Sequence, residues 1–254
     1  MKLPVLFVGH GSPMNAIETN TYTLKWEEVG RALPKPKVIL AISAHWYTEK
    51  TRTSDVIDPR IIYDMYGFPK ELYELAYPVK GSPELSEKLV DCLGPDVVID
   101  NHWGIDHGTW SVLCKMFPDA DIPVVQLSVN LNAPAKMHFE MGQKLAKLRN
   151  VGVLIFGSGN VVHNLSLINW SMPGGYPWAE AFDQYVKEHI LNKDFEAVVN
   201  YQLAGKCSEK AFYTPDHFYT LLYVLGASDT SDEIEVFNDV CLMGSMSMTG
   251  YLFR

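Results

Sequence analysis

Short apolar runs recur along the chain, and segments with helical spacing lie between them. The apolar runs are rich in Val, Ile and Leu and cover residues 5–8, 38–43, 97–99, 123–129 and 151–156. Apolar positions repeat with helical spacing over residues 83–92, 133–148 and 178–190. Strands that read as nearly continuous apolar runs and alternate with helices are typical of a mostly parallel sheet covered on both faces. The pattern therefore predicts an α/β fold with a central, mostly parallel sheet flanked by helices.

The last part of the chain shows a different order of elements. Residues 216–226 have the pattern of a helix, and two segments at 233–239 and 245–253 have the pattern of strands. We expect these two strands to pair as an antiparallel edge, which makes the sheet mixed. The segments 54–69 and 171–177 carry Pro and Gly beside aromatic residues, so they are read as surface loops packed on the body and not as linkers. One catalytic domain over residues 1–254 is therefore predicted.

Composition and charge narrow the class of protein. The chain has 254 residues, of which 47% are hydrophobic and 20% charged, as in an ordinary globular protein. The formal net charge of −9 argues against nucleic acid or an anionic membrane as the main partner. The sequence contains no apolar stretch of the roughly 18 residues that a transmembrane helix needs, and its first residues lack the apolar length of a secretory signal.

The cysteines indicate the compartment. Cys92, Cys114, Cys207 and Cys241 form no CxxC pair and are too widely spaced for a disulfide framework or a zinc ribbon. Free thiols are the simplest interpretation, and they fit a reducing cytoplasm.

Histidines stand at the predicted strand ends. His10, His45, His107 and His163 each lie at or just beyond the carboxyl end of an apolar run. In an open α/β sheet this edge is where ligand sites form. Neutral imidazoles are the commonest protein ligands for zinc, iron, copper and nickel. The sequence therefore predicts a metal site at this edge, with one or more histidines left for proton transfer.

The remaining histidines carry weaker signals. His217 opens the predicted helix at 216–226, where it is either part of the site or incidental. His138 and His189 lie inside amphipathic segments and are read as structural, and His102 is ambiguous but closer to a structural residue. The chain has no HExxH motif, which excludes a helix-borne protease zinc site, and it has no GxSxG motif, which weakens a serine-hydrolase interpretation.

Six short motifs, in order along nearly the whole chain, carry a resemblance to a known family. They are GHGSPM at 9–14, SAHW at 43–46, YDMYGFP at 63–69, WGIDHG at 103–108, SGNVVHN at 158–164 and TPDH at 214–217. Each motif alone is weak, but all six in this order are highly specific. On them the chain resembles the class III, LigB-type extradiol dioxygenases, and within these the 4,5-DOPA extradiol dioxygenase-like group.

The resemblance implies one active-site metal and roles for five histidines. The metal histidines of the family fall on His10 and His45, and the proton-transfer histidines of the wider superfamily fall on His107 and His163. In the DOPA-type branch the metal site is described with histidines that match His10, His45, His163 and His217. Many class III enzymes complete their ligand set with a Glu that has no clear counterpart here, so His217 is expected as the third ligand.

The function that the resemblance implies is the opening of a catechol ring, such as that of DOPA, with O2 inserted next to the vicinal hydroxyls. Fe(II) is expected for catalysis, and Zn(II) is plausible as the bound ion. His107 and His163 are the candidates for proton transfer, with Asp106 orienting its neighbourhood. Tyr47, Tyr66 and Phe68 are expected to wall a flat pocket for the ring. The partners are then a small catechol and O2, and the oligomeric state is left open.

Two other readings of the same histidines remain. One is a zinc-dependent hydrolase or another metal enzyme built on the same site. The other is a protein that binds a metal or ligand without catalysis. The presence of His107 and His163 argues against a mere binder, because a binder needs no spare acid or base.

Overall fold

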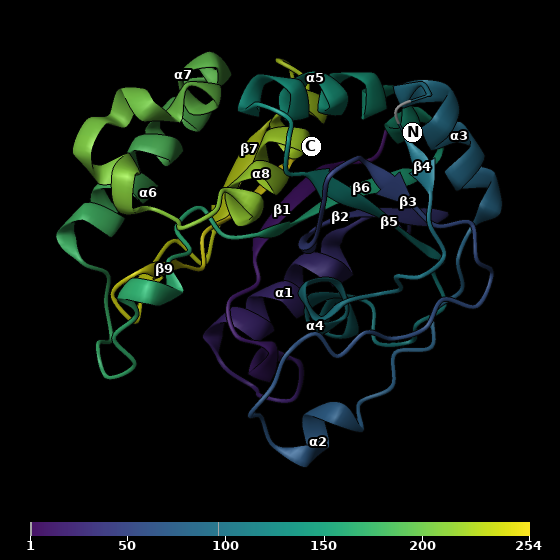
Figure 1. The fold of residues 1–254 in the computed structure, drawn as a ribbon, viewed down its shortest axis with the longest axis horizontal. Coiled ribbons are helices and arrows are strands. Elements are labelled where there is room, and N and C mark those ends of the chain that lie inside the picture. The colour runs from purple at the N-terminus through teal and green to yellow at the C-terminus, as the bar shows by residue number, and fades with distance from the viewer. Residues whose placement is uncertain (1, 96) are drawn as a thin grey trace.

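The strands form a mixed sheet whose centre is parallel (Figure 1). The computed structural model describes residues 2–95 and 97–254. The sheet has eight strands in the order β4-β3-β5-β2-β6-β1-β10-β7. Its central strands β5, β2, β6 and β1 run parallel to one another, whereas β10 and β7 are antiparallel at one end. The strands are β1 (Val5–Gly9), β2 (Val38–Thr48), β3 (Arg52–Thr53), β4 (Val98–Ile99), β5 (Val124–Asn130), β6 (Val153–Gly159), β7 (Ile234–Phe237) and β10 (Gly250–Phe253), and a separate pair is β8 (Cys241–Leu242) with β9 (Met246–Ser247).

Helices cover both faces of this sheet. In Figure 1, α5 and α8 lie over one face, and α1 and α4 lie over the other. The helices are α1 (Thr21–Ala32), α2 (Lys70–Tyr73), α3 (Pro83–Leu93), α4 (His107–Met116), α5 (Ala135–Leu145), α6 (Pro177–Leu191), α7 (Phe195–Val199) and α8 (Asp216–Ala227), with 3-10 turns η1 (Pro13–Ala16), η2 (Ala146–Val151), η3 (Leu165–Leu167) and η4 (Tyr201–Lys210). Among the described residues, no helix combines the length and apolar character needed to cross a bilayer.

Two apolar cores explain the continuous apolar runs of the sequence. Val5 and Phe7 of β1 pack into the core shared with α5 and α8, whereas Leu6 and Val8 pack into the core shared with α1 and α4. Successive side chains of a strand point to opposite faces, so a strand buried on both faces needs apolar residues at every position. The prediction of an α/β fold with a central, mostly parallel sheet flanked by helices is confirmed, as is the antiparallel pairing of the two late strands. The assignment of residues 1–254 to one catalytic domain stays a prediction.

Several helices and strands begin or end at other residues than the sequence pattern predicts. The predicted helices at 83–92, 178–190 and 216–226 are present as α3, α6 and α8, and the one at 133–148 is divided into α5 and η2. Strand β2 continues to Thr48, beyond the predicted end at 43, with a register shift against β5 between Ser43 and Tyr47. The late segment 245–253 contains two short strands, β9 and β10. Helices α1 and α4 were not predicted, because polar residues and glycines interrupt their apolar spacing.

Asp183 of α6 is a buried carboxyl group away from the histidines. Its side chain accepts a hydrogen bond from Thr249 at 2.8 Å, but its other carboxylate oxygen has no partner in the described residues. Burial raises the pKa of Asp183 to about 6, against the lowering effect of the bond from Thr249. Because the folded protein holds this proton more tightly than the unfolded chain does, stability falls as the pH rises from about 4 to about 6.

Replacement of Asp183 by Asn should remove this pH dependence. Relative to the D183N variant, the free energy of unfolding of the unmodified protein should fall by about 2 kcal/mol between pH 4 and pH 7, since a pKa raised by about two units corresponds to about 3 kcal/mol in full and part of this is already lost at pH 4. Urea denaturation of both proteins at several pH values measures the difference. A difference between the two proteins that stays constant over this range would contradict the assignment.

Candidate functional site

The predicted histidines meet at one edge of the sheet. His10 directly follows β1, His45 lies within the extended β2, and His163 lies four residues beyond the end of β6. The strands β2, β6 and β1 are parallel neighbours, so their carboxyl ends lie together. His107 is placed differently from expectation: it is the first residue of α4 and not the end of a strand. His217 is the second residue of α8.

The five imidazole rings form one cluster. The ring centroid of His45 lies 3.9 Å from that of His107 and 5.0 Å from those of His10 and His217. His163 stacks on His217 with centroids 3.6 Å apart and ring planes within 8°. The other three histidines stay outside: His138 is buried between α5 and α8 against Tyr219 and Tyr223, His189 bonds Asp194, and His102 is exposed. All site histidines predicted from the sequence are therefore brought together.

Close backbone packing holds these segments in place. An added Cβ at Gly159, the last residue of β6, would lie 2.0 Å from the backbone oxygen of His217. Only glycine therefore lets the first turn of α8 approach the strand this closely. The approach places His217 beside His10, whose backbone N–H donates to the carbonyl of Gly159 at 3.0 Å.

Ser158 fixes the tautomer of His10. The Ser158 hydroxyl donates its proton to the carbonyl of Gly108 at 2.5 Å, so it can only accept from Nδ1 of His10, which lies 2.9 Å from Oγ. His10 therefore carries its proton on Nδ1, and its Nε2 has a free lone pair. This nitrogen lies 3.2 Å from Nε2 of His45.

Asp64 fixes His45 and approaches His107. Nδ1 of His45 lies 3.0 Å from Oδ2 of Asp64, and Nδ1 of His107 lies 3.0 Å from Oδ1 of the same carboxylate, although it is not aligned for a hydrogen bond. The backbone N–H of His107 also donates to Oδ1 of Asp64 at 2.9 Å. Nδ1 of His45 thus donates to a carboxylate, which leaves Nε2 of His45 as a lone pair facing that of His10. The sequence interpretation overlooked Asp64 as a site residue, although it lies in the motif at 63–69.

His217 repeats the arrangement with another carboxylate. Its Nδ1 lies 2.6 Å from Oδ2 of Asp216, and its Nε2 is buried without a hydrogen-bond partner among the described residues. A buried nitrogen left unpaired is costly unless something binds it. The sequence analysis assigned the neighbouring Asp216 no role in the site, whereas the structure places it behind the imidazole.

The donor set fits a divalent metal ion. Two imidazole nitrogens bound to one ion at about 2.1 Å each lie about 3.0–3.4 Å apart, and the Nε2 atoms of His10 and His45 are 3.2 Å apart. Within the described residues, ring nitrogens of His10, His45 and His217 lie within 4.8 Å of one another. Carboxylates and a hydroxyl hold the far nitrogens of all three rings, as is usual behind metal-binding histidines.

A second group of possible ligands shares His45. His45, Asp64 and His107 also offer ligand atoms within 4.8 Å of one another. Asp64, however, already faces the Nδ1 atoms of both histidines, so its carboxylate is engaged as their partner. His163 belongs to neither group in the part of the chain that the structure describes, and its ligation of a metal stays a prediction.

The cluster keeps most of its imidazoles neutral. Burial and the neighbouring imidazole of His45 lower the pKa of His107, and burial and the neighbouring imidazole of His217 lower the pKa of His163 well below its usual value. Burial also lowers the pKa of His10 and of His217. Burial disfavours charge on His45 as well, but the bond to Asp64 and the nearby carboxylates outweigh it and raise the pKa of His45.

Asp106 positions α4 and does not bond the His107 ring. One oxygen of its buried carboxylate accepts from the Ser43 hydroxyl at 2.7 Å and from the backbone of Thr109, and the other accepts from Gln126 and Trp103. As the N-cap of α4 it fixes the residue that follows it, His107. The predicted orienting role of Asp106 thus acts through the start of the helix.

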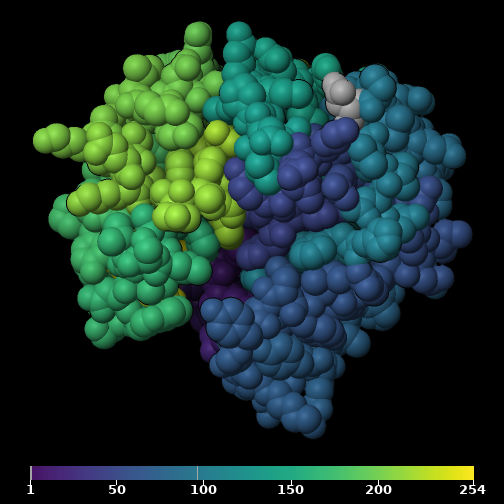
Figure 2. All heavy atoms as spheres, viewed as in Figure 1, coloured from purple at the N-terminus to yellow at the C-terminus, as the bar shows by residue number. Residues whose placement is uncertain are grey.

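A cavity of about 380 Å³ opens beside the cluster. His10, His45, His107 and His163 line it, whereas His217 lies behind His163. Figure 2 shows a hollow between the blue and green parts of the surface with purple N-terminal atoms at its floor. The complete lining is His10, Gly11, Ser12, Pro13, His45, Asp64, Met65, Tyr66, Phe68, His107, His163, Leu165, Trp170, Met243 and Met246.

Two of the three aromatic residues expected at the substrate lie in this lining. Tyr66 and Phe68 both line the cavity. Tyr47 is not among the lining residues, and it packs instead against the core shared with α5 and α8. Its strand β2 sends Tyr47 to the face opposite Trp46, away from the loop at 63–69.

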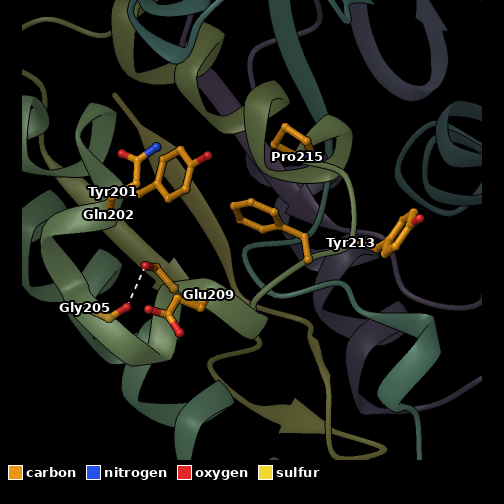
Figure 3. Close-up of a pocket in the computed structure, with 8 residues that line it drawn as sticks. Tyr201, Gln202, Gly205, Glu209, Tyr213 and Pro215 are labelled. Carbon is orange, nitrogen blue, oxygen red and sulfur yellow. Dashed lines mark hydrogen bonds between the residues drawn. The ribbon is translucent and has the colours of Figure 1, made fainter.

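A larger cavity of about 450 Å³ carries none of the histidines (Figure 3). It lies along η4 and the residues that precede α8, and its lining is Tyr201, Gln202, Gly205, Ser208, Glu209, Phe212, Tyr213 and Pro215. The hydroxyl of Ser208 is already bonded to the carbonyl of Gly205 at 2.7 Å. Without imidazoles this cavity offers no donor set like that of the cluster, so the smaller cavity is the candidate active site.

Comparison with known proteins gives one family and several relatives. The family described as the catalytic LigB subunit of aromatic ring-opening dioxygenase matches residues 5–254. The 4,5-DOPA dioxygenase extradiol of Escherichia coli (strain K12) is 47% identical over 97% of this chain and 93% of its own length. The protein of the same name from Beta vulgaris is 38% identical over 97% of this chain and 95% of its own. A crystal structure of an uncharacterized protein from Escherichia coli K12 is similar with a TM-score of 0.87 and 42% identity, and the match covers 99% of this chain and 100% of that one.

Proposed function

Because this chain belongs to the LigB family of extradiol aromatic ring-opening dioxygenases, we propose that it opens catechols such as DOPA at one divalent ion held by His10, His45 and His217. The observation that carries the metal assignment is the pair of Nε2 lone pairs of His10 and His45, which face each other at 3.2 Å. The buried Nε2 of His217, which has no hydrogen-bond partner in the part of the chain that the structure describes, supports the third ligand. Fe(II) is the ion proposed for catalysis, since imidazole ligands suit it and an extradiol enzyme must activate O2.

A bound divalent ion supplies an electrophilic centre that lowers the pKa of a catechol hydroxyl and orients the two reactants. His10 and His45 present their Nε2 atoms beside the cavity, and in the neutral rings the contacts of Nδ1 with Ser158 and Asp64 select the tautomer whose Nε2 carries a lone pair. The catechol is proposed to enter from the cavity, with its hydroxyl edge toward the imidazoles and its ring against Phe68 and Tyr66.

His107 is the proposed general base. It lines the cavity, and burial together with the neighbouring imidazole of His45 lowers its pKa, so it is neutral and can accept the proton of the second hydroxyl. The carboxylate of Asp64, 3.0 Å from its Nδ1, stabilises the imidazolium that forms. His163 lines the same cavity and is proposed as the acid that returns a proton during ring opening.

The test is anaerobic reconstitution with Fe(II), followed by oxygen uptake with DOPA and a panel of simple catechols. One O2 should be consumed per catechol, and a yellow semialdehyde-type product should form, because cleavage is next to the two hydroxyls and not between them. Protein loaded with zinc should give neither. Absence of oxygen uptake with every catechol, in protein with verified iron, would favour the zinc-hydrolase alternative.

Replacement of Asp64 by Asn should both lower the affinity for the metal ion and slow the ring-opening reaction. The amide cannot accept from His45 and stabilise His107 as the carboxylate does, and loss of such a partner typically reduces metal affinity about 10–100-fold. Competition with a chelator measures the affinity. Asp58→Asn is the matched control, since Asp58 is an exposed carboxylate in the same loop, paired with Lys80. Equal affinities of D64N and D58N would contradict the role of Asp64.

The free cysteines and the net charge support proposals for the cellular location and for the class of binding partner. Cys92, Cys114, Cys207 and Cys241 are all free thiols, which supports a cytoplasmic location. The acidic charge of the whole chain supports small molecules, and not nucleic acid or an anionic membrane, as its partners.

A further inference from the structure

We infer that Thr214 is a positioning residue of the metal site, because its hydroxyl holds the carboxylate of Asp216 against the ring of His217, the proposed third ligand. This inference rests on the proposed function, and it concerns how the third ligand is oriented. It is carried by two hydrogen bonds in series at the start of α8.

The two hydrogen bonds lead from the surface of the protein to the histidine cluster. The hydroxyl of Thr214 donates to Oδ1 of Asp216 at 2.5 Å. The other oxygen of this carboxylate, Oδ2, lies 2.6 Å from Nδ1 of His217. Thr214 is exposed, whereas the side chain of Asp216 is 15% exposed and that of His217 is 6% exposed. A surface hydroxyl is therefore connected, through one carboxylate, to an imidazole of the site.

The hydroxyl of Thr214 does not cap the helix that it precedes. The N-cap of α8 is Pro215, and no side chain makes a cap hydrogen bond there. A threonine at the start of a helix commonly accepts a hydrogen bond from a backbone N–H of the first turn. Here the hydroxyl donates to a carboxylate instead. Hydrogen bonds to a charged acceptor are stronger than those between neutral groups, so this bond is suited to fix the orientation of Asp216.

The groups behind the other two proposed ligands are held by the backbone. The hydroxyl of Ser158 donates to the carbonyl of Gly108, and the carboxylate of Asp64 accepts from the backbone N–H of His107. The third such group, Asp216, is held by a side-chain hydroxyl. A side-chain hydroxyl can be removed without a change in the backbone, so its contribution is open to a single substitution.

Without this hydroxyl the carboxylate of Asp216 loses one of two restraints. Among the described residues, the hydrogen bonds of this carboxylate are those with Thr214 and His217. The last torsion of an aspartate side chain is broad, so a carboxylate with one restraint turns more freely. The ring of His217 then keeps its nitrogen within 4.8 Å of those of His10 and His45 for less of the time.

The test measures the affinity of the protein for Zn(II) by competition with a chelator. Zn(II) is the probe because it binds imidazole without redox chemistry. Thr214→Val removes the hydroxyl at nearly constant volume and should lower the affinity about three- to tenfold, which is less than the 10–100-fold typical of a direct partner of a ligand. Thr214→Ser keeps a hydroxyl and should restore the affinity of the unmodified protein.

A second threonine provides the matched control. Thr230 is exposed, and its hydroxyl makes no hydrogen bond within the part of the chain that the structure describes. Thr230→Val should therefore keep the zinc affinity of the unmodified protein. Urea denaturation of the metal-free variants tests the alternative role. A Thr214 that only stabilises the start of α8 would lower the free energy of unfolding in Thr214→Val and leave the zinc affinity unchanged, which would overturn the inference.

A double-mutant cycle tests whether Thr214 acts through Asp216. Asp216→Ala removes the carboxylate and should lower the zinc affinity about 10–100-fold. In this background Thr214→Val should have no further effect, because the hydroxyl has lost its acceptor. An equal effect of Thr214→Val with and without the carboxylate would overturn the inference.

The outcomes separate the inference from the proposed function. A folded Thr214→Val protein with unchanged zinc affinity would overturn the inference and leave the proposed ligands in place. If His217→Ala keeps the zinc affinity of the unmodified protein, the proposed third ligand is wrong and the inference fails with it. Absence of ring opening with every catechol would reject the proposed reaction alone, because the zinc affinities are measured without turnover.

Discussion

Replacement of His10 by alanine should remove the bound metal and with it the ring-opening activity. His10 supplies one of the two Nε2 atoms that face each other at 3.2 Å, and its tautomer is fixed by Ser158 for this role. Loss of a partner behind a ligand reduces metal affinity about 10–100-fold, so loss of the ligand itself should reduce it by more than about 100-fold. Elemental analysis after reconstitution with Fe(II) measures occupancy, and oxygen uptake measures activity.

The control is an imidazole that belongs to no site. His102 is exposed, and within the described part of the chain its ring bonds Asp100 alone, so His102→Ala should keep full metal occupancy and full activity. Circular dichroism shows whether the His10 variant keeps its fold. A folded His10→Ala protein with full occupancy would show that the metal assignment is wrong.

Replacement of His107 by alanine should instead slow turnover strongly while the metal stays bound. His107 belongs to the second group of possible ligands, with His45 and Asp64, and His217 belongs to the first, with His10 and His45. We expect His107→Ala to reduce turnover about 10²–10⁴-fold, the usual contribution of a general acid or base. His217→Ala should lose the ion.

The pair of variants therefore decides between the two groups. If the ion were held by His45, Asp64 and His107, His107→Ala would lose the metal and His217→Ala would keep it. If His107→Ala loses the metal and His217→Ala keeps it, the metal is bound by His45, Asp64 and His107, and His107 is not the base. Single-turnover kinetics of the iron-loaded His107 variant then separate slow proton transfer from slow product release.

The sequence predicted the layers of the fold because both faces of the central strands are buried. The alternating contributions of Val5 and Phe7 to one core and of Leu6 and Val8 to the other produce an unbroken apolar run. The first turn of α4 escaped prediction because His107 and Gly108 start the helix, and its signal is instead the cap at Asp106. A helix that begins in this way is recognised from the hydrogen bonds of its cap and not from the hydropathy of its first residues.

The histidines of the site were predictable, but most of their partners were not. His10, His45 and His163 follow or extend strands, and the order of parallel strands brings such positions to one edge. Asp64 and Ser158 come from a loop and a buried strand, and neither residue type at those positions carries a pattern of its own. Their contribution appears only when the distances to the Nδ1 atoms are known. Tyr47 was predicted to line the cavity because it is close to His45 in the sequence, but it is not among the lining residues.

The separation of the proposed ligands along the chain ties the supply of metal to the lifetime of the protein. His10, His45 and His217 meet only when β1, β2 and α8 are assembled, so an unfolded chain cannot hold the ion in this way. An ion that binds the folded state alone stabilises it by about 4 kcal/mol when its free concentration is about 1,000 times Kd. A cell that runs short of the metal would therefore hold more unfolded chains, which proteases remove. Metal scarcity would then lower the amount of this enzyme as well as the activity of each molecule.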